Sequence, residues 1–305
     1  MKFAPAILLA LAFGAVPVAS AAPVPFSASG SAPAAITTTV DAFRAALGPL
    51  NANVGGSFGS GRREINWDGV PDAFAAPNNL PANFFNANSP RGVVLSTPGS
   101  GFQVSASAGA SSGTAVEFGN LNATYPGLFQ PFSPQRLFTA LGSNITDVNF
   151  FVPGSASAAS VSAFGAVFTD VDLANVTSLQ FFDLSNQTLG SFSVPAAIGN
   201  ETLSFLGVRF DAGERIGRVR ITAGNTALGG SDGGSIDLVA LDDFIYAEPT
   251  AVSAVPEPAT LLLVGPLLVA LWLVRRRRLR YGERDDSLQR LRKVTSSRLQ
   301  SLNKY

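Results

Sequence analysis

The sequence predicts an all-β fold, a β-sandwich of the jelly-roll type, in the middle of the chain. Short runs of alternating apolar and polar residues recur over residues 39–249, and turns rich in Gly and Asn separate them. The aromatic residues are 23 Phe against 2 Trp and 4 Tyr, and Phe fills a core without a polar group that needs a partner. A segment of this length can bury the core of one all-β domain.

Two different segments precede the first predicted strand. Residues 22–38 are rich in Pro, Ala and Ser, so we expect them to form a flexible lead-in. A helix is predicted to begin at Thr39, which can cap it, and to end at Gly48, which a proline follows. The apolar residues of this helix share one face: Val40, Phe43 and Leu47.

The strand predictions depend on alternation and on the content of β-branched and aromatic residues. Turn residues at 97–100 and 184–187 predict two hairpins, each joining the segments on either side of it. Residues 250–258 are predicted to be a linker that follows the last strand. The predicted strands are residues 63–67, 92–96, 101–106, 160–168, 178–183, 188–194, 205–210, 218–222 and 238–246.

The N-terminal end has the three parts of a secretory signal peptide, over residues 1–21. Lys2 supplies the positive charge, residues 6–16 form an apolar run, and the small residues at 18–21 are typical of a cleavage site. The apolar run is too short to span a bilayer, so we expect the segment to be cleaved and the protein to be exported.

A second apolar segment, residues 259–274, predicts a transmembrane helix near the C-terminal end. At about 1.5 Å per residue its 16 residues reach roughly 24 Å, slightly less than a hydrocarbon core of ~30 Å. Residues 275–305 follow as a basic tail, which the positive-inside rule places in the cytoplasm. The tail begins with a basic cluster: Arg275, Arg276, Arg277 and Arg278.

Directly before the apolar segment lie Pro256, Glu257 and Pro258. The order of Pro-Glu-Pro, apolar helix and Arg cluster resembles the PEP-CTERM sorting domain of Gram-negative bacteria, a tail that is sometimes also named after ice-binding proteins. The resemblance implies that a membrane-embedded sorting protease, an exosortase, recognises this motif, and that the protein is associated with extracellular polysaccharide or biofilm matrix. The family's tails usually end just after the basic cluster, whereas this chain continues over residues 279–305.

The charges of the middle and of the tail have opposite signs. Residues 22–255 carry 9 Arg, no Lys and 17 Asp or Glu, a net charge of −8, whereas residues 275–305 carry 11 Lys or Arg and 3 Asp or Glu, a net charge of +8. An acidic ectodomain argues against nucleic acid as a partner. The chain has no Cys and no His, which excludes disulfides, thiolate catalysis and His-based metal sites.

Clustered Asp residues are candidates for binding a hard cation such as calcium, which takes oxygen ligands. Their spacing is not that of an EF-hand loop, and Asp is common at turns and strand edges without a metal. The sequence therefore leaves two interpretations open, a calcium site and solvated turn residues. The candidate ligands are Asp170, Asp172, Asp232, Asp242 and Asp243.

Two alternative functions involve polysaccharide. Trp67 is the single Trp of the ectodomain and can serve as a glycan platform, although a lone Trp on an alternating strand is more typical of a core. Glu64, Asp68 and Glu117 can supply a glycoside hydrolase only if two of their carboxylates lie at the required separation.

No catalytic motif or cofactor motif appears in the sequence, so calcium is the one cofactor considered. We expect a non-enzymatic protein that is held in the inner membrane during sorting and then reaches the cell surface or the extracellular matrix. An anchored carbohydrate-binding module and a carboxylate glycosidase are the alternatives.

Overall fold

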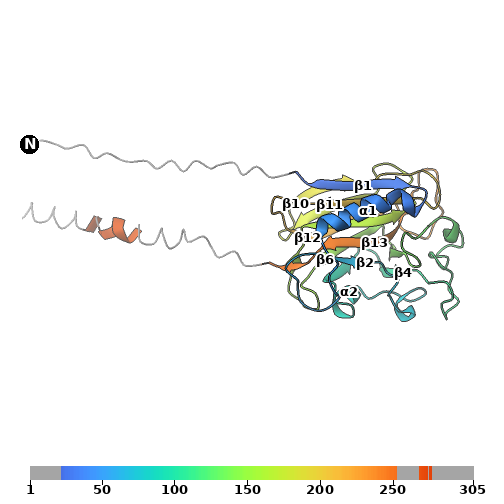
Figure 1. Ribbon diagram of the computed structural model, residues 1–305, viewed down its shortest axis with the longest axis horizontal. Helices are drawn as coiled ribbons and strands as arrows, with labels where there is room; N and C mark the ends of the chain where they lie inside the picture. Colours follow the sequence, from blue (N-terminus) through green and yellow to red (C-terminus); the bar gives the residue numbers. More distant parts are fainter. Residues whose placement is uncertain (1–21, 253–267, 274, 277–305) are drawn as a thin grey trace, which may run out of the picture. The chain divides into compact units, whose positions relative to one another are not determined.

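The computed structural model describes residues 22–252, 268–273 and 275–276. Residues 22–252, which we call the β-domain, consist mainly of antiparallel strands, so the prediction of a mainly β fold is confirmed. Figure 1 shows the strands of the β-domain and the helix α1 (Pro33–Leu47), which lies against strand β1.

The larger sheet has seven strands, and all its pairings are antiparallel. Strand β2 (Arg62–Ile65) pairs with β13 outside the main path of this sheet. The other six follow in hydrogen-bonded order: β1 (Val24–Gly30), β11 (Leu203–Arg209), β8 (Ala163–Thr169), β13 (Ala240–Ala247), β5 (Phe138–Leu141) and β4 (Gly101–Val104).

The second sheet has five strands, also antiparallel. Its order is β10 (Thr188–Ser193), β9 (Ser178–Asp183), β12 (Ile216–Thr222), β6 (Ile145–Phe150) and β3 (Val93–Ser96). A short pair joins β14 (Thr250–Ala251) to β7 (Ala159–Ser160). The remaining elements are one helical turn and two short 3₁₀ helices: α2 (Phe84–Ala87), η1 (Asp72–Phe74) and η2 (Tyr125–Gly127).

The two larger sheets share one hydrophobic core. Phe150 of β6 illustrates this contact, because its ring centroid lies 6.2 Å from that of Phe164 in β8 and 5.6 Å from that of Tyr246 in β13. Phe is also the most frequent residue among the largest fully buried side chains. The prediction that most Phe residues serve the core is therefore confirmed.

Helix α1 packs on the larger sheet through Phe43. The Phe43 ring lies 5.3 Å from that of Phe26 in β1 and 5.6 Å from that of Phe205 in β11. Gly165 and Gly207 face each other across β8 and β11, and a Cβ at either position would lie 2.9 Å from the Phe43 ring. The two glycines therefore make the space in which Phe43 rests on the sheet.

The prediction of a flexible lead-in over residues 22–38 is wrong, because β1 and the first half of α1 lie there. Every residue of β1 pairs with β11, and that pairing overrides a composition typical of linkers. Pro33 stands at the first position of α1, where a missing N–H costs nothing, so Thr39 lies inside the helix and does not cap it. The predicted end at Gly48 is confirmed, with φ of 92°.

The strand predictions overlap β2, β3, β4 and β8 to β13, but one of the two hairpins is wrong. Strands β9 and β10 pair directly through the turn at residues 184–187, as predicted. Strands β3 and β4 instead belong to different sheets, and the chain crosses from one to the other at residues 97–100. Each of these strands pairs with β6 or β5, which the sequence did not reveal.

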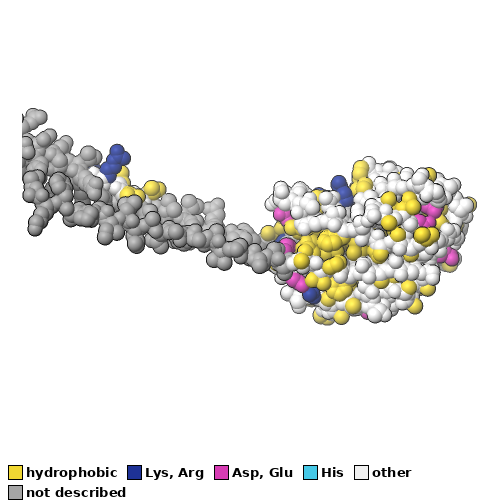
Figure 2. Space-filling view, turned by 90° about the horizontal axis from the view of Figure 1, so that it is seen from above, with side chains coloured by type: hydrophobic (Ala, Val, Ile, Leu, Met, Phe, Trp, Pro, Cys, Tyr) yellow, Lys and Arg dark blue, Asp and Glu magenta, His cyan; other side chains and the backbone are white. Residues whose placement is uncertain are grey.

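Several predictions concern residues that the structure does not describe: the signal peptide at 1–21, the motif at 256–258 and most of the tail at 277–305. Residues 268–273 and 275–276 are helical. Within the described residues, no helix combines the length and apolar character needed to cross a membrane. Figure 2 shows one face of the β-domain, on which Asp, Glu and Arg side chains are scattered over a mostly uncharged surface.

Candidate metal centre

Asp170 comes directly after β8 and is the innermost residue of a carboxylate cluster. Its φ of 69° is left-handed, and its N–H donates to the carbonyl of Thr202 at 2.9 Å. The side chain is fully buried, and neither carboxylate oxygen accepts a hydrogen bond from a described residue. The fold therefore holds an unpaired carboxylate in its interior.

Asp172 and Asp232 bring two more carboxylates to Asp170. Asp172 lies two residues after it, whereas Asp232 belongs to the long connection between β12 and β13. One oxygen from each of the three side chains lies within 4.8 Å of the other two. The structure therefore brings together three of the five Asp residues that the sequence singled out, and we call them the Asp170 cluster.

Backbone N–H groups position the two outer carboxylates of the cluster. Gly199 donates its N–H to Oδ1 of Asp172 at 2.8 Å, and Leu238 donates its N–H to Oδ1 of Asp232 at 2.9 Å. Oδ2 of each carboxylate accepts no hydrogen bond from a described residue. Both side chains are half-buried, so the cluster reaches from the interior to solvent.

Asp237 supports the cluster, and sequence reasoning missed it. Its carboxylate is fully buried and accepts two backbone N–H groups, from Asp172 at 3.1 Å and from Leu173 at 3.3 Å. Burial raises the pKa of Asp237, while these two donors lower it. Asp237 thus fixes the backbone that carries Asp172. Its signal in the sequence was a further Asp directly before the last predicted strand.

The electrostatics of the cluster are unfavourable for a negative charge. Burial and, to a smaller extent, the charges of Asp232, Asp172 and Asp237 together raise the pKa of Asp170 to about 8. Nothing that shifts the pKa of Asp170 lowers it. Four carboxylates converge here, and a bound cation would remove their repulsion.

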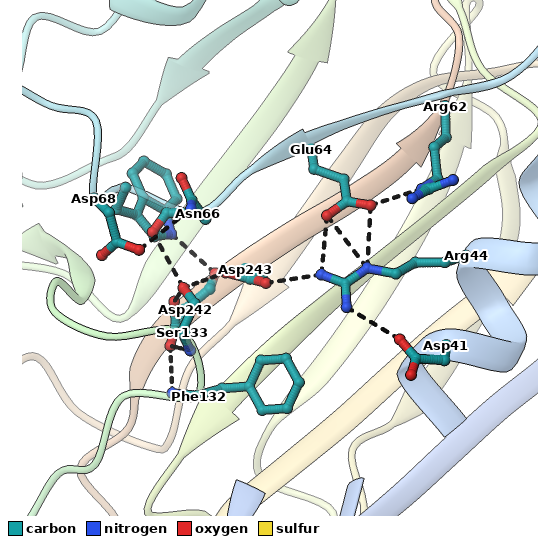
Figure 3. Close-up of polar contacts among 11 residues, drawn as sticks. Asp41, Arg44, Arg62, Glu64, Asn66, Asp68, Phe132, Ser133, Asp242 and Asp243 are labelled. Atoms are coloured by element: carbon teal, nitrogen blue, oxygen red, sulfur yellow. Dashed lines mark hydrogen bonds and ion pairs between the residues drawn. The ribbon is translucent and has the colours of Figure 1, made fainter. Parts of the chain in front are cut away.

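Asp242 and Asp243, the other two candidate metal ligands from the sequence, lie apart from the Asp170 cluster. They form a second group in β13, beside Ser133 (Figure 3). Asp242 accepts the N–H groups of Phe132 at 2.6 Å and Ser133 at 3.1 Å. Asp243 accepts the Ser133 hydroxyl at 2.8 Å and pairs with Arg44 at 3.2 Å. These partners satisfy the carboxylates without a metal.

Arg44 of α1 joins this second group to strand β2 (Figure 3). Its guanidinium donates to Glu64 through Nη2 at 2.9 Å, and Glu64 also accepts Arg62 at 2.6 Å. Burial raises the pKa of Asp243 to about 6, even though the Ser133 hydroxyl and the charge of Arg44 lower it. Burial, and then the charge of Asp243, raise the pKa of Asp242 well above its ordinary value.

Trp67 is a core residue, so its role as an exposed glycan platform is wrong. Its side chain is 1% exposed. The indole stacks on Phe138, with ring centroids 4.1 Å apart, and Nε1 donates to the carbonyl of Asp242 at 2.9 Å. The indole N–H thus has its partner inside the protein, which is what permits full burial.

Glu64, Asp68 and Glu117, the three carboxylates considered for glycoside hydrolysis, each contact different residues. Glu64 is held by arginines, and Asp68 accepts the N–H groups of Gln135 at 2.6 Å and Arg136 at 3.0 Å. Burial and then the charge of Glu201 together raise the pKa of Glu117 to about 7. Each of the three thus interacts with a different set of neighbours.

In comparisons with known proteins, no family model, curated protein or solved structure matches the chain.

Proposed function

We propose that this chain is an exported, non-enzymatic protein of the cell envelope or extracellular matrix, sorted through its C-terminal tail by a protease of the exosortase type. The proposal includes a β-sandwich of the jelly-roll type as the displayed part. Two antiparallel sheets that share one core support that architecture. The signal peptide and the tail predicted from the sequence supply the route of export.

The observation that carries the proposal is the position at which the β-domain ends. Its last long strand, β13, lies in the middle of the larger sheet, and β14 closes the domain at Ala251. The Pro-Glu-Pro motif begins at Pro256, five residues later. A protease that cuts at the motif would therefore leave every strand of the β-domain in place.

The contacts of the acidic residues support a non-enzymatic role. Glu64 and Asp68 are engaged by arginines or backbone N–H groups, as ordinary structural carboxylates are. Trp67, which the carbohydrate-binding alternative needs on the surface, is buried. We therefore propose that any association with polysaccharide uses a mostly uncharged face of the β-domain, such as the one in Figure 2, and not an aromatic platform.

Mass spectrometry of the intact protein from the envelope of a host with the protease tests the proposal. The mature chain should end near residues 256–260 and lack residues 279–305. Glu257→Gln should leave the full-length form, because the recognised carboxylate is gone. Glu283→Gln, in the basic tail, is the matched control and should be processed normally. Mature protein that still carries residues 279–305 would overturn the proposal.

A further inference from the structure

We propose that Asp170, Asp172 and Asp232 bind a calcium ion that ties the β12–β13 connection to the end of β8. The inference goes beyond sorting and display, because it concerns the β-domain alone. It depends on two observations, the convergence of three carboxylates and the lack of any protein partner for the innermost one.

The Asp170 carboxylate differs from the other buried carboxylates of the described residues. Glu248 pairs with Arg63, Asp147 with Arg218 and Arg220, and Asp243 with Arg44. Asp237 and Asp242 each accept two backbone N–H groups. Asp170 has no such donor, and a buried polar group without a partner is costly enough that proteins rarely keep one. A cation would supply the missing partner.

The three carboxylates favour calcium over other metal ions. Three carboxylates from two chain segments offer hard oxygen ligands, and the chain has no His or Cys for softer metals. Oxygens on opposite sides of calcium stand about 4.6–5.2 Å apart, against about 4.0–4.2 Å for magnesium. The three ligand oxygens lie within 4.8 Å of one another, a span that one calcium ion can bridge. Magnesium usually keeps several waters and takes one or two carboxylates, so a set of three carboxylates favours calcium. Carbonyls and water would complete its six to eight ligands.

The ion would join two parts of the chain that are far apart in sequence. Asp170 and Asp172 follow β8, whereas Asp232 lies in the connection that leads into β13. Tyr125 also holds this connection, because its hydroxyl donates to the carbonyl of Gly230 at 2.9 Å and accepts the N–H of Gly229 at 2.6 Å. Without a cation, no hydrogen bond between the described residues links the Asp232 side chain to Asp170 or Asp172, so its attachment is weaker.

Thermal unfolding of the full-length chain in detergent, with calcium or magnesium as the probe, tests the site. Calcium should be raised to about 20 mM, well above the ~10⁻⁴–10⁻³ M at which extracellular calcium modules bind. At about 100 times Kd, the melting temperature should rise by roughly 5–10 °C relative to EDTA. Magnesium should require at least a tenfold higher concentration for the same shift.

The variant Asp170→Asn separates a metal ligand from a purely structural residue. Its amide cannot supply a carboxylate ligand, so calcium should no longer raise its melting temperature above the value in EDTA. Asp232→Asn, at a half-buried position, should also lose the calcium response. Asp41→Asn is the matched control, because Asp41 is exposed on α1, and it should respond like the wild type.

Three results would overturn the inference: a wild-type melting temperature that is the same in EDTA and calcium, an undiminished calcium response in Asp170→Asn, and equal responses to calcium and magnesium. The sorting proposal is tested separately by the position of the mature C-terminus.

Discussion

Arg63 is a fully buried charge whose guanidinium makes five hydrogen bonds, and its loss should strongly destabilise the β-domain. The side chain is 0% exposed, and its guanidinium makes a two-point ion pair with Glu248, with Nε and Nη2 at 2.8 and 2.9 Å from the carboxylate. The remaining donors reach the carbonyls of Val54, Pro90 and Gly56. One side chain therefore joins β2, the end of the β-domain and two loops.

The variant Arg63→Met keeps most of the apolar stem and removes all of these donors. Glu248, 4% exposed, then keeps only the amide of Asn51 at 2.9 Å and the N–H of Phe58 at 3.1 Å. Removing one partner of a buried ion pair costs about 3–5 kcal/mol, because the other charge stays buried. At about 2–4 °C per kcal/mol for a domain of this size, the melting temperature should fall by roughly 6–20 °C.

Urea unfolding followed by circular dichroism measures this loss. The matched control is Arg220→Met, since Arg220 is 42% exposed and its partner Asp147 keeps Arg218, so a loss of about 1 kcal/mol or less is expected. The double variant Arg63→Met/Glu248→Gln should recover most of the stability, because no unpaired charge remains. A loss in Arg63→Met no larger than that in Arg220→Met would refute the reasoning.

Three further predictions concern the β-domain. Residues 22–252 should fold alone, with a β-type circular dichroism spectrum and a melting temperature unaffected by reductant, because the chain has no Cys; a helical spectrum would contradict this. Gly207→Ala should cost about 1–3 kcal/mol in urea unfolding through its clash with Phe43, whereas Gly69→Ala, in open space, should cost little; equal losses would contradict the packing of α1. Asp243 has a folded pKa of about 6, above its ordinary value of 3.8, so its charge destabilises the fold progressively as pH rises from about 4 to above 6. Relative to Asp243→Asn, the wild type should lose up to about 3 kcal/mol over that range, and parallel pH curves would rule this out.

Strands with one buried and one exposed face were predictable from the sequence. Strands that are buried on both faces, or whose composition is typical of a linker, were not. Strand β12 alternates buried and partly exposed residues, so the period of two was visible. Three consecutive residues of β5 are buried, which leaves no alternation to detect. Strand β1 contains Pro25 among Ser, Ala and Gly, and only its pairing with β11 makes it a strand.

The second acidic group was hidden by an irregular strand. Consecutive residues of a regular strand point to opposite faces, yet the Ser133 hydroxyl contacts Oδ1 of Asp242 at 3.4 Å and Oδ1 of Asp243 at 2.8 Å. The pairing of β13 with β8 shifts register between Leu241 and Phe244, a β-bulge that includes both carboxylates. The bulge brings both carboxylates to Ser133, and the sequence carries no signal for it.

The Asp170 cluster shows where prediction from the sequence reaches its limit. The two Asp residues after β8 are two positions apart and were found together, but Asp232 is 60 positions beyond the second of them. Only the antiparallel pairing of β8 with β13 brings the β12–β13 connection back to the end of β8. Nor does sequence tell which carboxylate lacks a donor, because Asp237 and Asp170 are the same residue type with the same burial. The donors of Asp237 are backbone N–H groups, whose direction is set by the turn after β8. A cation site is therefore visible only in the tertiary structure, where the turn after β8 gives Asp237 two donors and leaves Asp170 with none.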